Sequence, residues 1–197
     1  MIAVILQPSY IPWRGYFDQI RRADLFIFYD DVQYDKHGWR NRNQIKSANG
    51  KQWLTIPVHS QGVTQGVPIR DVQIDWRTAW PEKHLKALTS SYARAPHFKE
   101  YQPLLDEFYG RHDSCIADFT IETTIRIARE LGTGHTRFMR SSELTGIDGH
   151  RSDRSHSPSD RQVRVAGRDY GSPDSPCPIC RTRGVSCRTY IGRSSGA

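Results

Sequence analysis

Residues 2–31, "IAVILQPSYIPWRGYFDQIRRADLFIFYDD", decide the fold. Residues 2–6 and 25–29 are short apolar runs of the kind that forms buried strands. The stretch between them, residues 12–22, carries large side chains at helical spacing: Trp13, Tyr16, Phe17 and Ile20. Strand, helix and strand in this order predict a βαβ unit and therefore a parallel sheet.

The same patterns continue along the chain to about residue 146. We expect further strands at residues 52–58, 67–75 and 136–139, and helices at residues 78–94, 98–110 and 114–131, with Gly132 as a C-terminal cap. The predicted fold class is α/β, with a Rossmann-like or nucleotidylyltransferase-like parallel sheet core, helices around it and a disordered tail.

Composition changes abruptly near residue 147. Residues 1–146 hold 19 Lys and Arg against 16 Asp and Glu, whereas residues 147–197 hold 9 against 5. After Ile147 there is no Leu, Phe, Trp, Met, Lys, Glu or Asn, so this segment offers too little apolar surface to order its backbone. We therefore predict an α/β domain at residues 1–146 and a disordered Arg- and Ser-rich tail at residues 147–197. The tail is either natural or, as we prefer, the product of a frameshift.

The sequence also bears on location and metals. No run approaches the roughly 18 apolar residues of a membrane span, and the N-terminus lacks the basic region of a signal peptide. A single cysteine in the body, Cys115, fits a reducing compartment, so we expect a cytoplasmic protein. In the tail, "CPIC" and Cys187 supply three thiols, one ligand short of a zinc module. We expect no metal and no cofactor.

Polar and aromatic residues follow the first predicted strand. In parallel sheets, ligands bind beyond the carboxyl ends of the strands, and a helix N-terminus favours an anion such as phosphate. The candidate substrate-binding residues here are Gln7, Tyr10, Trp13, Gly15 and Tyr16. The alternative for the aromatic residues is packing in the core.

An acidic pair, Asp30 and Asp31, closes the second predicted strand. Carboxylates at this place can act as a base, anchor a hydroxyl or bind a metal, so both are candidate catalytic residues. Adjacent residues of a strand point to opposite faces, so we expect at most one of them to face a given site. The alternative is a solvated turn.

The segment "WRNR" follows, and it contains Arg40, Asn41 and Arg42. In an extended chain the two arginines share one face, and their planar guanidinium groups suit phosphate or carboxylate. We take the three residues as candidate substrate-binding residues. The alternative is a basic hairpin at the surface.

His84 lies in the predicted helix at residues 78–94 and is a third candidate catalytic residue. The alternative is an ordinary surface histidine of a helix. The sequence has no HExxH motif, Walker A loop, GxGxxG or GxSxG motif and no internal repeat, which leaves zinc hydrolase, P-loop and α/β-hydrolase chemistry without support.

Four segments resemble the WbqC-like protein family over about residues 1–146. They are "ILQPSYIPWRGYFDQIRRADLFIFYDDVQY", "WRNRNQIKSANGKQWLTIPV", "HLKALTSSYARAPHFKEY" and "RFMRSSEL". The resemblance implies a bacterial cytoplasmic protein encoded among surface-polysaccharide genes, including those for O-antigen lipopolysaccharide. Family members continue after "RSSEL" in ordinary globular sequence, whereas this chain does not.

Together these observations predict a transferase that acts on a nucleotide-linked sugar or a similar activated metabolite, inactive here if the chain is truncated. The alternative is a non-catalytic nucleotide-sugar-binding or accessory protein of the same pathway. As partners we expect a small anionic or nucleotide-linked substrate and no specific nucleic acid. If elements of the fold are missing, exposed core surface should favour self-association.

Overall fold

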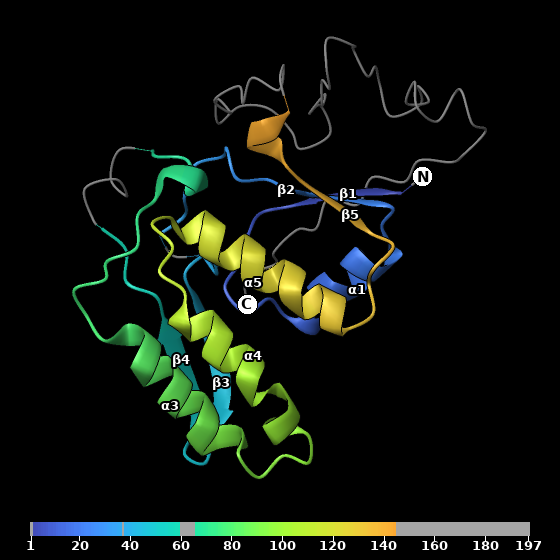
Figure 1. The fold of residues 1–197 in the computed structure, drawn as a ribbon. Helices are drawn as coiled ribbons and strands as arrows, with labels where there is room; N and C mark the ends of the chain where they lie inside the picture. Colours follow the sequence, from blue (N-terminus) through green and yellow to red (C-terminus); the bar gives the residue numbers. More distant parts are fainter. Residues whose placement is uncertain (1, 37, 60–65, 145–197) are drawn as a thin grey trace. The chain divides into compact units, whose positions relative to one another are not determined.

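The computed structural model describes residues 2–36, 38–59 and 66–144 (Figure 1). Its elements are, in chain order, β1 (Ala3–Leu6), α1 (Arg14–Arg22), β2 (Leu25–Phe28), β3 (Arg42–Ser47), β4 (Gly50–Thr55), η1 (Ile69–Asp71), α3 (Trp80–Tyr92), α4 (Phe98–Gly110), α5 (Ile116–Glu130), β5 (Arg137–Arg140) and η2 (Ser141–Glu143).

The chain forms two compact units, each built from separate stretches of sequence. The first, here called the sheet unit, contains the chain up to Gln7, Arg14–Val32 and the described residues from Ala128 onward. The second, here called the hairpin unit, contains Pro8–Trp13 and the described residues of Gln33–Ile127.

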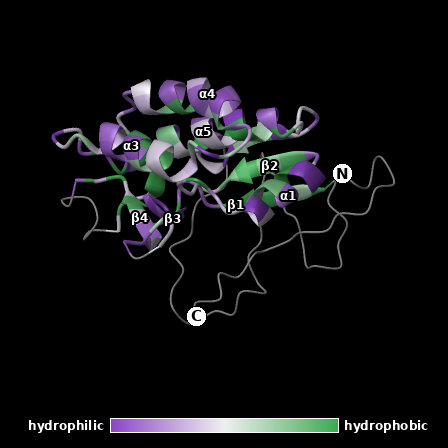
Figure 2. Ribbon diagram, turned by 90° about the horizontal axis from the view of Figure 1, so that it is seen from below, coloured by the Kyte–Doolittle hydropathy of each residue, from purple (hydrophilic) through white to green (hydrophobic). Residues whose placement is uncertain are grey.

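A parallel three-stranded sheet in the order β1-β2-β5 forms the centre of the sheet unit. The central strand, β2, is apolar along its length, and Figure 2 colours it as hydrophobic. Phe26 and Phe28 are buried there, and the Tyr16 ring of α1 packs 5.3 Å from that of Phe26. The predicted βαβ unit and the α/β fold class are confirmed.

The hairpin unit is built on an antiparallel pair, β3 and β4, with Ser47 opposite Gly50 at its turn. Gly50 has a φ of 105°, a backbone conformation that glycine adopts without steric cost. Figure 1 shows α3 and α4 side by side, and α3 also contacts β3. A hairpin was the alternative for the "WRNR" segment, and it is confirmed for the chain from Arg42 onward.

The strand predicted at residues 67–75 was wrong. This stretch forms the short 3-10 helix η1 and three isolated bridges, Pro68 with Gln33, Ile74 with Val58 and Gln73 with Cys115. Val72 and Ile74, two residues apart, are buried as the alternating pattern indicated, whereas Ile69 lies in η1 and is buried out of phase with them. The segment has no continuous partner strand.

The end of α5 agrees with the sequence. Gly132 has a φ of 78°, its N–H donates to the carbonyl of Arg129, and the N–H of Thr133 donates to the carbonyl of Ala128. This is the hydrogen-bonding pattern of a glycine C-cap. It ends the helix and leads the chain into β5.

None of the helices described is long and apolar enough to cross a membrane. The predicted tail and its three cysteines lie outside the described residues, and the division of the chain at residue 146 stays a prediction.

Candidate functional site

The carboxyl ends of the three parallel strands carry a polar cluster in the sheet unit. Gln7 follows β1, Asp30 and Asp31 follow β2, and Ser141 follows β5. Parallel pairing places these positions at one edge of the sheet, which is where ligands bind in this fold class. The Tyr16 hydroxyl donates to the backbone carbonyl of Gln7 at 3.2 Å, so both of these predicted residues belong to the same edge.

Asp30 is the buried anchor of this edge, with 0% of its surface exposed. Its carboxylate accepts hydrogen bonds from Arg140 Nε at 2.7 Å, from Ser142 Oγ at 2.9 Å and from Ser142 N–H at 3.1 Å. Burial raises the pKa of Asp30, but the bonds from Arg140 and Ser142 outweigh this effect and leave the pKa below its ordinary value. Asp30 therefore stays ionised and ties the end of β2 to the end of β5.

Asp31 is half-buried and shares the Ser141 hydroxyl with its neighbour. Ser141 Oγ lies 2.6 Å from Asp31 Oδ1 and 3.1 Å from Asp30 Oδ1, and it accepts the N–H of Asp30 at 3.1 Å. A hydroxyl has one proton to donate, so one of the two carboxylates keeps a lone pair for another donor. Since Asp31 is the more exposed of the two, it is the better candidate for contact with a ligand.

The expectation that Asp30 and Asp31 point to opposite faces was wrong. Strand β2 ends at Phe28, so the alternation of a strand no longer applies two residues later. Both carboxylates turn toward the Ser141 hydroxyl instead.

A second polar cluster lies inside the hairpin unit. The Tyr10 hydroxyl is 2.9 Å from His84 Nδ1 and 2.5 Å from the Tyr109 hydroxyl. Tyr10 is 2% exposed and His84 is 6% exposed. The structure thus brings together two predicted residues, Tyr10 and His84, and adds Tyr109. His84 is not the surface histidine that the alternative described.

Burial lowers the pKa of His84 to about 4, although a backbone hydrogen bond with Thr55 favours the protonated ring. Trp80 packs against the imidazole with ring centroids 5.3 Å apart. A histidine with this pKa is neutral at pH 7 and a weak base. The geometry therefore suits a positioning residue that holds Tyr10.

The loop Pro8–Trp13 has an unusual backbone. Ile11, which precedes Pro12, has a φ of 44°, a left-handed conformation that is strained for a β-branched residue. Asn43 Nδ2 donates to the carbonyl oxygens of both Tyr10 and Ile11. The hairpin thereby holds this loop in place.

Arg40 and Asn41 also make structural contacts in the hairpin unit. Arg40 Nη1 donates to the carbonyl of Pro8 at 3.1 Å and to Ser9 Oγ at 2.9 Å. Asn41 is buried, and its Nδ2 donates to the carbonyl of Ile56 at 2.8 Å. Their predicted role in binding substrate stays a prediction, beside a structural role that the contacts demonstrate.

Arg42 belongs to an exposed aromatic group on the hairpin. Its guanidinium carbon lies 5.0 Å from the ring centroid of Trp53, and the Trp53 ring lies 5.3 Å from that of Trp39. Both tryptophans are exposed. Flat faces next to a guanidinium can stack on a ring and bind a phosphate. In the same unit Trp13 is 67% exposed, so core packing is wrong for this residue.

The predicted residues therefore fall into two groups. Those in the sheet unit are Gln7, Gly15, Tyr16, Asp30 and Asp31, and those in the hairpin unit are Tyr10, Trp13, Arg40, Asn41, Arg42 and His84. Among the described residues no group of three or more His, Cys, Asp or Glu is placed to hold a metal ion.

Sequence reasoning missed Arg140, Ser141 and Ser142, which complete the edge of the sheet unit. They follow directly on the predicted strand at residues 136–139. The criterion that selected the acidic pair, polar residues at the carboxyl end of a strand, would have selected them as well.

Comparisons with known proteins agree with the suspected family. The model of the WbqC-like protein family matches residues 7–173, which extends beyond residue 146, where the resemblance seen in the sequence ended. "Uncharacterized protein Rv1507c" of Mycobacterium tuberculosis (strain ATCC 25618 / H37Rv) is 49% identical over 105 residues. These residues are 53% of this chain and 45% of that protein, so the chain spans less than half of its length. No solved structure matches the chain.

Proposed function

The chain belongs to the WbqC-like protein family, and on that basis we propose that it is a cytoplasmic transferase for a nucleotide-linked sugar or a similar activated metabolite. The pathway would be assembly of bacterial surface polysaccharide of the O-antigen type. The observation that carries the proposal is the polar edge of the sheet unit, where the residues after three parallel strands converge.

In this proposal Asp31 is the residue that contacts substrate at the edge. Its carboxylate anchors a sugar hydroxyl or takes a proton from it, and the Ser141 hydroxyl at 2.6 Å orients it. Asp30 and Arg140 position the two strand ends and do not react. In the hairpin unit, Arg42 on Trp53 offers the chemistry that binds phosphate beside a ring.

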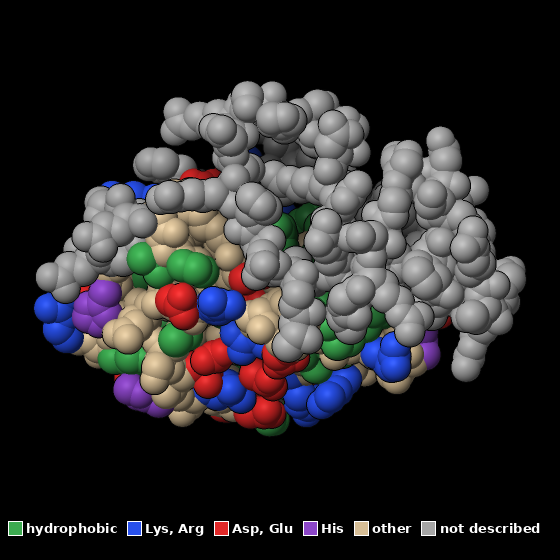
Figure 3. Space-filling model, turned by 90° about the horizontal axis from the view of Figure 1, so that it is seen from above, with side chains coloured by type: hydrophobic (Ala, Val, Ile, Leu, Met, Phe, Trp, Pro, Cys, Tyr) green, Lys and Arg blue, Asp and Glu red, His purple; other side chains and the backbone are tan. Residues whose placement is uncertain are grey.

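The second candidate is a non-catalytic protein that binds nucleotide-sugars in the same pathway. The low basicity of buried His84 favours it, because His84 was one of the three candidate catalytic residues. Specific binding of nucleic acid has less support. Figure 3 shows acidic and basic side chains interspersed among the described residues on the face it presents, whereas nucleic-acid sites gather basic ones.

Turnover separates the two candidates. The chain and its mycobacterial relative are incubated with UDP-, GDP- and dTDP-linked hexoses and with acyl or glycosyl partners, and the products are followed by mass spectrometry. The transferase is supported if the chain converts one of these compounds, if Asp31→Asn abolishes the conversion, and if the control Asp18→Asn, at an exposed carboxylate, leaves it unchanged. Binding without conversion supports the accessory protein. If the chain neither binds nor converts any of these compounds, both candidate functions are contradicted.

A further inference from the structure

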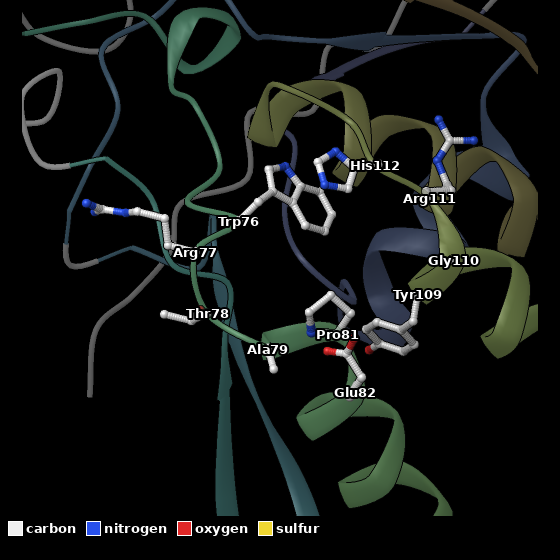
Figure 4. Close-up of a pocket in the computed structure, with 10 residues that line it drawn as sticks. All are labelled: Trp76, Arg77, Thr78, Ala79, Pro81, Glu82, Tyr109, Gly110, Arg111 and His112. Carbon is white, nitrogen blue, oxygen red and sulfur yellow. The ribbon is translucent and has the colours of Figure 1, made fainter.

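A surface hollow of about 410 Å³ lies wholly within the hairpin unit, where α3 begins and α4 ends (Figure 4). Trp76, Pro81, Glu82, Tyr109 and His112 contribute to its lining. The indole of Trp76 and the imidazole of His112 stack with ring centroids 3.9 Å apart. The volume falls within the range of roughly 300–1,000 Å³ that is usual for small-molecule sites.

The charges around the hollow leave one carboxylate unbalanced. Arg77 pairs with Asp75 at 2.6 Å and Arg111 pairs with Asp113 at 2.8 Å. Figure 4 shows both guanidinium groups directed away from the aromatic rings of the hollow. Glu82 is exposed and, within the described residues, makes no ion pair. Arg77 and Arg111 also line the hollow, but each is neutralised by its aspartate, so Glu82 is the lining residue whose charge no described ion pair balances.

Tyr109 has a fixed hydroxyl behind the hollow. Its oxygen lies 2.5 Å from the Tyr10 hydroxyl, which in turn lies 2.9 Å from His84 Nδ1. A hydroxyl has one proton and two lone pairs, so the Tyr109 oxygen keeps at least one lone pair whichever of the two tyrosines donates in their contact. Tyr109 can therefore accept a hydrogen bond from a ligand in the hollow.

We propose that this hollow binds the primary ammonium group of a small molecule whose ring or alkyl body packs on Trp76. An ammonium group has three donors and no acceptor, which matches the Glu82 carboxylate and a lone pair of the Tyr109 oxygen. Aromatic faces add attraction for a cation. Amino sugars and cyclic alkylamines share this chemistry. The inference does not depend on the proposed transferase, because every group involved belongs to the hairpin unit.

A purely structural role makes a different prediction. Glu82 lies in the first turn of α3, where a carboxylate stabilises the helix through its dipole. In that case Glu82→Gln would lower the stability of the helix slightly and leave the affinity for an amine unchanged.

Isothermal titration calorimetry on the full chain at pH 7 tests the proposal with two matched pairs of probes, cyclohexylamine against cyclohexanol and glucosamine against glucose. The amine of at least one pair should bind 10-fold or more tightly than its neutral partner. Glu82→Gln should weaken that binding about 10-fold, and Tyr109→Phe should weaken it measurably. The matched control is Asp106→Asn, which removes an exposed carboxylate of α4 that does not line the hollow and should leave the affinity unchanged.

Each other outcome overturns the proposal. Equal affinity for the amine and the neutral partner removes the ammonium group from recognition. Amine binding that survives in both Glu82→Gln and Tyr109→Phe removes these residues and leaves Glu82 its structural role alone. Absence of amine binding at millimolar concentration shows that the hollow is not such a site. Comparison of the pairs then separates amino sugars from simple amines.

Discussion

Asp30 and Asp31 are neighbours with different surroundings, and that difference governs what each can do. Asp30 is enclosed and bonded to Arg140 and Ser142, whereas Asp31 is partly open to solvent beside Ser141. A buried carboxylate with its lone pairs occupied contributes to stability, and a partly exposed one is available to a ligand. Substitution at the two positions should therefore separate stability from binding.

Asp30→Asn should lower the free energy of unfolding by about 3 kcal/mol, because it leaves the Arg140 guanidinium without its charged partner. Urea unfolding at pH 7 measures this change. Asp18→Asn, at an exposed carboxylate paired with Arg21 and Arg22, is the control and should change the free energy of unfolding much less, because solvent screens exposed ion pairs. A loss at Asp30 as small as the loss at Asp18 would contradict the anchoring role.

The ionised Asp30 carboxylate also predicts how the free energy of unfolding depends on pH. The pKa of Asp30 is lower in the folded chain than its ordinary value, so the folded state holds fewer protons at low pH than the unfolded state. Its stabilising effect is complete above the unfolded pKa of about 3.9 and disappears as pH falls through the folded pKa. The difference between wild type and Asp30→Asn should accordingly shrink below about pH 4.

Arg40 and Arg42 should also differ. Arg42→Ala should weaken binding of an anionic ligand by about 1.5–3 kcal/mol, the range for charged hydrogen bonds, with little change in unfolding. Arg40→Ala should in addition lower stability, because Arg40 holds Pro8 and Ser9. Calorimetry and urea unfolding of both variants measure these effects. Unchanged affinity in the double variant would remove both arginines from the site.

At the scale of elements, His84 links α3 to the loop Pro8–Trp13 and to β4. Its pKa is lowered to about 4 in the folded chain, against about 6.5 when unfolded. The unfolded state therefore takes up a proton first, and the free energy of unfolding should fall as pH drops from about 6.5 to 4, by at most roughly 3 kcal/mol.

His84→Gln should flatten that part of the pH profile. The control is His97→Gln, which changes an exposed histidine beside Glu100 and should retain the slope. Urea unfolding at half-unit steps between pH 7 and pH 4 measures both variants. An unaltered slope in His84→Gln would show that this histidine is not protected from protonation.

Elements with strong local signals could be predicted from the sequence, and those that depend on distant partners could not. Strands β1 and β2 and helix α4 follow from apolar spacing within a few residues. The bridges of Ile74 and Gln73 depend on Val58 and Cys115, so a local alternating pattern misled the prediction.

The same limit applies to the candidate site. Gln7 and Asp31 could be selected because they follow strands that the sequence shows plainly. The bonds from Ser141 to Asp30 join residues 111 positions apart, and only the pairing of β5 with β2 brings them together. The second polar cluster, which joins Tyr109, Tyr10 and His84, likewise forms only where the loop Pro8–Trp13 meets helices α3 and α4.

For the whole molecule, residues 147–197 lie outside those described, so the prediction about them rests on their composition. The segment has few large apolar side chains and contributes little burial. Its deletion should therefore leave the free energy of unfolding unchanged within about 0.5 kcal/mol. The remaining chain should self-associate if family elements are missing. Urea unfolding and analytical ultracentrifugation measure both effects. Strong amide protection throughout residues 150–190 in hydrogen exchange would contradict the prediction.

The central claim is that the carboxyl edge of the sheet unit binds a nucleotide-linked sugar through Asp31. Calorimetric titration of wild type and Asp31→Asn with a panel of UDP-, GDP- and dTDP-linked hexoses tests it most directly. Wild type should bind at least one of them, and Asp31→Asn should bind it at least about 10-fold more weakly, a loss of about 1.4 kcal/mol, with unfolding unchanged. Equal affinity of the two proteins, or no binding by wild type, would contradict the claim.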